Sequence, residues 1–220
     1  MEIETILFIL EIIGTISFAV SGAFVAIKAK FDIFGVLVIG CITAFGGGVM
    51  RDMLIGKLPP RVFENAYILL IAAGSALATF CISYLYRKKF DGVRGKIEYI
   101  NNVFDAIGLA AFTVMSTEIA ITEGDVNNVF LSLVLGVLPA VGGGLLRDIL
   151  TETPPYIFTK HVYAVAAIGG AVLYYVMRLW IDNTILPSIL GMLFVFGIRM
   201  IATKYHWQLP KIALEENDDK

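Results

Sequence analysis

The sequence has 220 residues, of which 58% are hydrophobic and only 16% are charged, and its mean hydropathy is +0.80. Soluble domains contain about 45–50% apolar and about 25% charged residues, so this composition argues against a water-soluble domain and for a chain surrounded mostly by lipid. The formal net charge of −2 gives no support to a nucleic-acid partner. Cys41 and Cys81 both lie in apolar runs, and we expect two free, buried thiols rather than a disulfide or a metal site.

Seven segments are apolar over all or nearly all of the roughly 20 residues that a transmembrane helix needs. They are residues 5–27, 33–50, 65–86, 100–121, 126–146, 162–177 and 183–199. The connections between them are short, which leaves no room for a separate soluble domain. We therefore predict a single transmembrane domain over residues 1–203 and a cytoplasmic tail over residues 204–220.

The positions of lysine and arginine predict the orientation in the membrane, because these residues are enriched in cytoplasmic loops. Most of them fall after the first, third and fifth segments and in the C-terminal stretch that begins at Arg199. The alternate loops carry Lys57, Arg61 and Arg178. We expect a multi-pass protein of the cell (inner) membrane, with its N-terminus outside and its C-terminus in the cytoplasm.

An internal repeat divides the chain into two related halves, with two blocks that match at offsets of 96 and 94 residues. The matches are GGGVMRD at 46–52 with GGGLLRD at 142–148, and ExxGxxxF at 11–18 with DxxGxxxF at 105–112. Each half contains three spans, and because three is odd, the second half enters the bilayer in the opposite orientation. We predict an all-α membrane protein with inverted three-helix repeats at 5–86 and 100–178 and a seventh helix at 183–203.

The two glycine triplets are the first candidate functional residues. They are Gly46, Gly47, Gly48, Gly142, Gly143 and Gly144. Glycine weakens a helix by roughly 1 kcal/mol relative to alanine, and freed carbonyls at membrane depth are tolerated only inside protein or beside a water-filled cavity. We predict that the triplets break the second and fifth helices and turn carbonyl groups toward a permeating ion. Close packing of helices, which glycine also allows, is the alternative.

An arginine and an aspartate follow each triplet, as Arg51-Asp52 and Arg147-Asp148. A charge at membrane depth costs about 2.5–3.5 kcal/mol on insertion scales, so each one needs a partner. Adjacent residues of a helix do not face each other. We therefore predict ion pairs across the pseudo-symmetry, Arg51 with Asp148 and Arg147 with Asp52. The alternative is that both pairs lie hydrated at the membrane surface, because prolines soon follow.

Two acidic residues and two serines complete the candidate site. Glu11 and Asp105 occupy equivalent positions near the starts of the first and fourth spans. We expect them toward opposite membrane faces, where they either concentrate cations at two pore mouths or lie at the interface. Ser17 and Ser21 lie four residues apart, on one face of the first span. They either line a pore or form polar contacts between helices.

The twin GGGxxRD blocks, set in two three-span repeats followed by a seventh span, resemble the prokaryotic TRIC (trimeric intracellular cation) channel family. The resemblance covers about residues 5–203, and related bacterial proteins are commonly labelled glycine transporters. It implies a homotrimer in the lipid bilayer, with glycine-kinked second and fifth helices beside a pore in each protomer that conducts monovalent cations, chiefly potassium. Animal members carry a lysine-containing motif in the fifth span. Here Leu145 and Leu146 follow the triplet, so the resemblance does not extend to lysine-based gating.

These observations predict a passive channel for potassium or sodium ions, with selectivity from carbonyl oxygens at the glycine breaks and acidic residues at the mouths. The alternative is a secondary transporter of glycine or a similarly small solute, whose ammonium and carboxylate groups bind at broken helix ends. The sequence contains no P-loop, HExxH motif or nucleophile elbow. We therefore expect no enzymatic activity, no cofactor and no metal site.

Overall fold

The structure is a computed structural model and describes residues 2–86, 94–124, 128–159 and 162–207. Every regular element in these ranges is an α-helix. Within them, the helices long and apolar enough to cross a membrane are α1 (Glu2–Lys28), α2 (Ile33–Leu54), α4 (Ala66–Leu85), α6 (Arg94–Glu123), α7 (Val129–Leu150), α9 (Tyr163–Trp180) and α10 (Ile185–Lys204). Two short helices, α3 (Arg61–Glu64) and α8 (Tyr156–Thr159), follow α2 and α7.

The seven long helices confirm the predicted fold class. The largest departure is in α6, which begins at Arg94 rather than near residue 100. It is also the most buried of the seven, because α1, α7, α9 and α10 all pack against it. The basic loop at 87–93, which supported the predicted orientation, lies outside the described residues, as does most of the predicted tail, residues 208–220.

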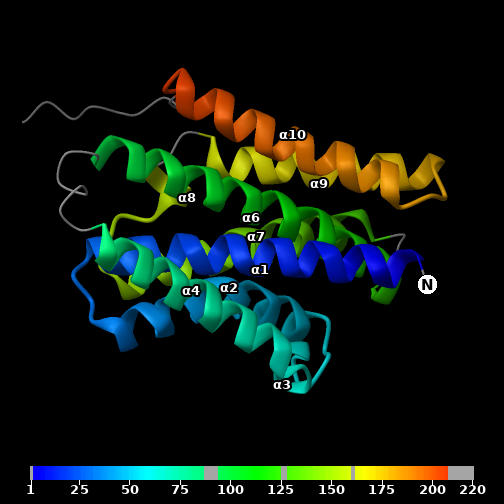
Figure 1. Cartoon of the computed structure of the whole chain (residues 1–220). Helices are drawn as coiled ribbons and strands as arrows, with labels where there is room; N and C mark the ends of the chain where they lie inside the picture. The colour runs from blue at the N-terminus through cyan, green and yellow to red at the C-terminus, as the bar shows by residue number, and fades with distance from the viewer. Residues whose placement is uncertain (1, 87–93, 125–127, 160–161, 208–220) are drawn as a thin grey trace, which may run out of the picture.

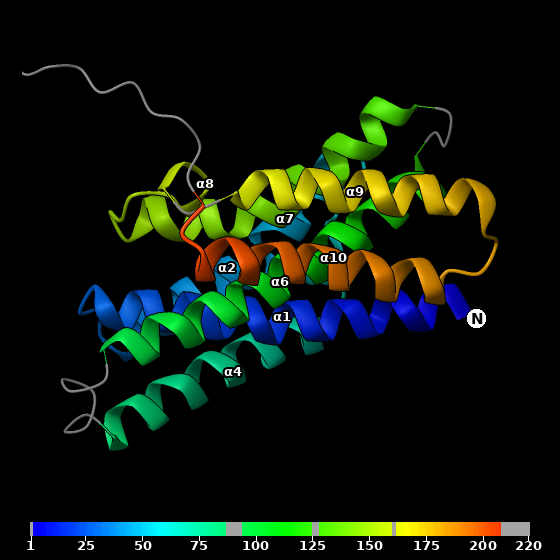
Figure 2. The same ribbon diagram turned by 90° about the horizontal axis from the view of Figure 1, so that it is seen from above.

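The two three-helix repeats are inverted, as predicted. α1, α2 and α4 form the first repeat, and α6, α7 and α9 form the second. α1 and α6 pack side by side, with α4 and α9 on opposite flanks of this pair (Figures 1 and 2). α1 begins at the end of the bundle where α3 lies, here called the α3 end, and α6 begins at the opposite end, the α8 end (Figure 1). The seventh span, α10, packs on α6 and α9.

Aromatic rings and glycines join α1 to α6 in a symmetric way. The rings of Phe18 and Phe112, at equivalent positions, are buried and stacked, with centroids 5.3 Å apart and an interplanar angle of 16°. A methyl group on Gly14 would lie 2.7 Å from the Phe112 ring, and one on Gly108 would overlap the Phe18 ring. Each glycine therefore leaves the space that the phenylalanine of the other repeat fills.

α2 and α7 pack against each other at the glycine triplets, and both helices are continuous there. A methyl group on Gly47 would overlap the carbonyl oxygen of Pro139, and one on Gly143 would overlap that of Thr43, the position equivalent to Pro139. The predicted breaks are therefore wrong for this structure. The glycines allow two helices to approach closely, and the packing gained offsets their low helix propensity.

The two cysteines are free, as predicted. Their predicted burial is wrong, since Cys41 is half-buried in α2 and Cys81 is exposed on α4. An exposed position on a membrane span faces apolar surroundings when the protein lies in lipid, so the apolar run around Cys81 does not require it to be inside the protein.

Candidate functional site

Two clusters of charged side chains lie at opposite ends of the bundle. The first-repeat cluster consists of Glu11, Arg51, Asp52, Arg61 and Tyr67. The second-repeat cluster consists of Ser21, Asp105, Arg147, Asp148, Tyr156, Tyr163 and Arg199. A buried charge costs several kcal/mol unless it is paired and hydrogen-bonded. The partners of each arginine therefore decide what the clusters can do.

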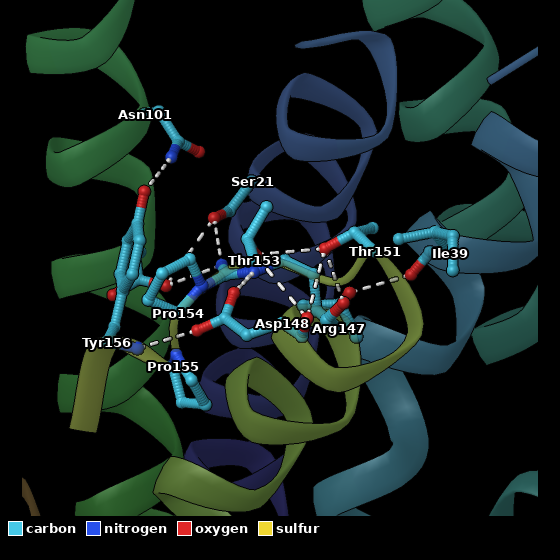
Figure 3. A network of polar contacts seen from close by, with 12 residues as sticks. Ser21, Ile39, Asn101, Arg147, Asp148, Thr151, Thr153, Pro154, Pro155 and Tyr156 are labelled. Atoms are coloured by element: carbon cyan, nitrogen blue, oxygen red, sulfur yellow. Dashed lines mark hydrogen bonds and ion pairs between the residues drawn. The ribbon is translucent and has the colours of Figure 1, made fainter. Parts of the chain in front are cut away.

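Arg147 is the centre of the second-repeat cluster and is fully buried. Its Nη1 donates to Asp105 Oδ1 at 2.8 Å and to Ser21 Oγ at 2.6 Å, and its Nε donates to Asp148 Oδ1 at 2.8 Å. Three helices, α1, α6 and α7, supply these groups, as Figure 3 shows in part. Two carboxylates of the second repeat thus offset the charge of one guanidinium group, and the Ser21 hydroxyl links this cluster to α1 of the first repeat.

Asp148 also positions the short helix α8. Its second carboxylate oxygen accepts a hydrogen bond from the backbone N–H of Tyr156 at 2.7 Å (Figure 3). The Tyr156 ring lies under the Arg147 guanidinium, 4.6 Å from it, and its hydroxyl accepts from Asn101 Nδ2 at 3.0 Å. Burial raises the pKa of Tyr156 to about 12, so its hydroxyl stays protonated at neutral pH.

Arg199 reaches the same cluster from α10. It is buried, its Nη2 lies 3.9 Å from Asp105 Oδ2, and its guanidinium lies 4.6 Å from the centre of the Tyr163 ring. Arg199, which supported the predicted orientation as a charge at the C-terminal end, is thus buried within the last span. The sequence does contain a feature that indicates this burial: Arg199 lies inside an otherwise apolar stretch, GMLFVFGIRMIAT. Charged residues within a span usually face the protein interior.

The first-repeat cluster repeats the main features of this geometry at the α3 end. Nε and Nη2 of Arg51 donate to Asp52 Oδ1 at 2.9 and 2.8 Å, and both side chains are buried. Asp52 Oδ2 accepts a hydrogen bond from the backbone N–H of Arg61 at 2.9 Å, at the start of α3. Asp52 and Asp148 therefore play the same part, each joining an arginine to the short helix that follows.

The predicted cross-pairs, Arg51 with Asp148 and Arg147 with Asp52, are wrong. The inversion of the repeats places the end of α2 and the end of α7 at opposite ends of the bundle (Figure 1), which separates the proposed partners. Each arginine instead binds the aspartate that follows it, because its long side chain folds back to the neighbouring carboxylate. The alternative of hydrated surface pairs is also wrong, because all four side chains are buried.

Glu11 and Asp105 lie in different environments although their positions are equivalent. Glu11 is half-buried near the α3 end and accepts a hydrogen bond from Tyr67 Oη at 3.4 Å. It lines a cavity of about 20 Å³, together with Thr15, Arg51 and Arg61, which has room for about one water molecule. Asp105 is fully buried and bound to Arg147, so in this structure it does not lie at an open pore mouth.

The second-repeat cluster contains polar atoms that lack a hydrogen-bond partner among the described residues. They are Asp105 Oδ2, Arg147 Nη2 and Tyr163 Oη, all buried. A methyl group on Gly144 would lie 3.2 Å from Tyr163 Oη and 3.6 Å from Arg147 Nη2, so the hydroxyl and the guanidinium both lie beside this glycine. Buried polar groups are nearly always hydrogen-bonded. A water molecule or a polar solute beside Gly144 would satisfy Tyr163 Oη and Arg147 Nη2.

The remaining predicted site residues pack between the clusters or beside them. A methyl group on Gly46 would meet the Leu146 side chain, and one on Gly142 would meet Met50, both at 2.7 Å. Gly48 lies beside Arg51, where a methyl group would be 3.8 Å from Nη2. Ser17 is buried in α1. Of the two serines, Ser21 contacts the second-repeat cluster, since its hydroxyl lies 3.5 Å from Asp105 Oδ1.

Two further ion-pair groups were not found from the sequence. Glu118 of α6 is buried and binds Arg178 of α9 through both carboxylate oxygens, at 3.0 and 3.3 Å, and also accepts a hydrogen bond from Tyr174 at 2.9 Å. At the α3 end, Glu123 pairs with Arg61 and with Lys57, whose Nζ lies 3.3 Å away, and so links the first repeat to the second. None of these residues belongs to a repeated motif, so the internal repeat that points to the other charged residues does not point to them.

Comparison with known proteins agrees with this architecture. The model of the Glycine transporter family matches residues 8–83 and 102–179, which correspond to the two repeats. UPF0126 inner membrane protein YadS of Escherichia coli (strain K12) is 32% identical over 212 residues, covering 94% of this chain and 97% of the relative. UPF0126 membrane protein YvgT of Bacillus subtilis (strain 168) is 35% identical over 204 residues, covering 92% and 94%.

Solved structures of TRIC channels share the fold. A chain from a structural study of conductance through TRIC cation channels is 33% identical, with a TM-score of 0.79 over 94% of this chain and 97% of that one. A prokaryotic TRIC channel crystallised in 0.5 M KCl is 29% identical, with a TM-score of 0.83 over 94% and 100%. The TRIC trimeric intracellular cation channel orthologue of Rhodobacter sphaeroides is 28% identical, with a TM-score of 0.82 over 92% and 99%.

The fold and the paired clusters define a polytopic α-helical membrane protein, with two inverted three-helix repeats and an added seventh helix. Within that class, the chain belongs to the Glycine transporter family and shares the structure of the prokaryotic TRIC channels.

Proposed function

We propose that this protein is a channel for monovalent cations, potassium or sodium, with a pore in each protomer between the inverted repeats. The observation that carries the proposal is the placement of two equivalent arginine–carboxylate clusters at opposite ends of one interface. Similarity to TRIC cation channels over nearly the whole length of both chains supports it. Both clusters pair their arginines with carboxylates, which limits the repulsion that a buried guanidinium would exert on a passing cation.

The proposed route joins the two clusters. It passes the glycine triplets of α2 and α7, with Ser17 and Ser21 on α1 and with Glu11 and Asp105 toward its two ends. The stacked rings of Phe18 and Phe112 fill the middle of the interface in this structure. α2 and α7 also pack closely at the glycine triplets. Opening of the route there requires the two helices to bend or separate, and glycine triplets permit such bending because they lack side chains.

The proposed assembly is a homotrimer in the cell inner membrane, with the N-terminus outside and the C-terminus in the cytoplasm. The orientation rests on the distribution of lysine and arginine, and the trimer rests on the resemblance to TRIC channels. The transmembrane domain is proposed to span residues 1–203, with repeats at 5–86 and 100–178, the seventh helix at 183–203 and a cytoplasmic tail at 204–220.

A second candidate function is secondary transport of glycine or a similarly small solute. Two buried polar atoms of the second-repeat cluster favour it, because Arg147 Nη2 can bind a carboxylate and Asp105 Oδ2 can bind an ammonium group. The family to which the chain belongs is also described as Glycine transporter. A transporter needs an occluded site that opens to one side at a time, whereas a channel needs a continuous wetted path when open.

Flux into proteoliposomes that contain the purified full chain separates the two functions. One set of vesicles holds a potassium gradient with a voltage-sensitive dye, and another receives labelled glycine with and without a sodium or proton gradient. The channel predicts electrogenic potassium movement and no glycine uptake above that of empty vesicles. Saturable glycine uptake that depends on a coupling ion, without potassium leak, would assign the second function and reject the first.

A further inference from the structure

The second-repeat cluster takes one of its two arginines from outside the inverted repeats. Arg147 belongs to the repeated GGGxxRD block, whereas Arg199 lies on α10, the helix that has no counterpart in the repeats. Arg199 is 1% exposed, its Nη2 lies 3.9 Å from Asp105 Oδ2, and its guanidinium lies 4.6 Å from the centre of the Tyr163 ring. The seventh helix therefore brings a positive charge to the α8 end of the interface between the repeats.

The first-repeat cluster obtains its second arginine in a different way. Arg61 comes from α3, the short helix that follows α2, and its backbone N–H donates to Asp52 at 2.9 Å. In the second repeat, the residue with the same backbone contact is Tyr156 of α8, and α8 contains no charged residue. Arg199 of α10 therefore adds the charge that α8 does not supply.

The two carboxylate oxygens of Asp105 meet two different guanidinium groups. Oδ1 accepts a hydrogen bond from Arg147 Nη1 at 2.8 Å. Oδ2 accepts no hydrogen bond within the described part of the chain, and Arg199 Nη2, at 3.9 Å, lies beyond hydrogen-bond distance from it. Arg147 therefore holds Asp105 in place by a hydrogen bond, whereas Arg199 acts on Asp105 through its charge.

We propose that Arg199 sets how strongly the α8 end of the ion route attracts a cation. This inference rests on the proposed function, because it concerns the route past the second-repeat cluster. A guanidinium group beside a carboxylate opposes the approach of a second cation to that carboxylate. The opposition is strong here, because buried charges are screened far less than charges in water. Arg199 therefore limits cation entry, and the helix outside the repeats controls the charge at one end of the route.

The two ends of the route differ in how well their second arginine is screened. The side chain of Arg61 is 20% exposed and pairs with Glu123, which is 35% exposed. Arg199 is 1% exposed and Asp105 is fully buried. Water and salt therefore screen Arg61 more than Arg199. Loss of the Arg199 charge should favour cation entry from the α8 end over entry from the α3 end, so that the current differs between the two directions.

Planar-bilayer recording of the purified full chain in symmetric potassium chloride tests this role with Arg199→Gln and Arg199→Lys. At low potassium chloride, Arg199→Gln should raise the unitary current about threefold in one direction and less in the other, below the roughly tenfold or larger effect of a whole charged cleft. The gain should shrink at high potassium chloride, where cation entry no longer limits the current. Arg199→Lys keeps the charge and should show little of the gain.

Lys204→Gln is the matched control, because it removes an exposed positive charge further along the same helix. It should leave the unitary current unchanged in both directions. A thermal melt of each variant shows that the fold is retained. A current of folded Arg199→Gln that is equal to or below that of the native protein would overturn the inference. An equal gain from Arg199→Lys or from Lys204→Gln would also overturn it.

A second readout tests the inference if the native protein carries no current, a result that would reject the proposed function alone. Without Arg199, Asp105 Oδ2 should bind a monovalent cation, and a cation that binds the folded state stabilises it. The melting temperature in detergent should then rise more for Arg199→Gln than for the native protein when potassium chloride replaces N-methylglucamine chloride at equal ionic strength. In that case an equal response of the two proteins would overturn the inference.

Discussion

Gly47 and Gly143 occupy equivalent positions where α2 and α7 pack together, and each lies against a backbone carbonyl of the other helix. Pro139 supplies the carbonyl beside Gly47, and Thr43, the position equivalent to Pro139, supplies the one beside Gly143. The arrangement is symmetric, so neither helix can shift without disturbing the same contact in both repeats. The glycine triplets therefore hold the two halves together in this structure, and any opening of a pore between the repeats has to begin by loosening this contact.

Gly143→Ala should destabilise the protein, because the added methyl group would overlap the Thr43 carbonyl oxygen on a backbone that is packed on both sides. Overpacking of this kind costs typically 1–3 kcal/mol. Gly74→Ala is the control, because Gly74 lies in α4 with nothing within 4 Å of an added methyl group. A melting temperature in detergent that falls for Gly143→Ala and stays level or rises for Gly74→Ala is expected. Equal melting temperatures would contradict the packing role.

Asp105→Asn should destabilise the second-repeat cluster, because it leaves two buried guanidinium groups, Arg147 and Arg199, with Asp148 as the one remaining carboxylate of the cluster. Removing one partner of a buried ion pair costs about 3–5 kcal/mol. Adding Arg199→Gln removes one of the excess charges and should recover part of the loss. Thermal melts of the two single variants and the double variant measure this coupling. A loss in the double variant equal to the sum of the two single losses would show that Arg199 and Asp105 do not interact.

The sequence was sufficient to predict the seven spans and their inversion, because hydropathy and an odd-numbered repeat determine both. It also identified Arg51, Asp52, Arg147 and Asp148, since repeated charges in apolar segments are rare. Their partners could not be predicted in the same way. Pairing depends on which ends of the helices meet, and Glu118, Arg178 and Arg199 carry no repeat signal. The glycine triplets illustrate a further limit. Glycines are suited both to a break in a helix and to the close packing of two helices, so the sequence does not decide between the two.

Tyr156 should make stability depend on pH in the alkaline range. Its pKa is raised to about 12 in the folded protein from the ordinary value of 10.0, so the unfolded chain loses this proton first as pH rises. The stabilisation is complete below pH 10 and is lost as pH rises toward 12. By pH 11 the loss is about 1.4 kcal/mol. The difference in free energy of unfolding between the native protein and Tyr156→Phe, measured by denaturant titration at pH 9 and pH 11, should change by that amount. A constant difference would show that burial does not raise the pKa of Tyr156.

Glu118→Gln and Glu123→Gln provide a matched comparison of buried and exposed ion pairs. Glu118 is buried and holds Arg178 by two contacts, so its loss should cost about 3–5 kcal/mol. The carboxyl side chain of Glu123 is 35% exposed, and its pairs with Lys57 and Arg61 should contribute at most about 1 kcal/mol. Thermal melts at low and high salt distinguish them. A larger loss for Glu123→Gln would mean that the α3 end, rather than the contact of α6 with α9, holds the second repeat in place.

Planar-bilayer recording of the purified full chain in asymmetric potassium chloride tests cation conduction most directly. The proposed function predicts stepwise currents that reverse near the potassium equilibrium potential and shift little when chloride is replaced by a large anion. Asp105→Asn should reduce the unitary current, because it leaves excess positive charge at one end of the route. Membranes that contain folded protein but show no current, or currents that reverse near the chloride equilibrium potential, would contradict a cation pore between the inverted repeats.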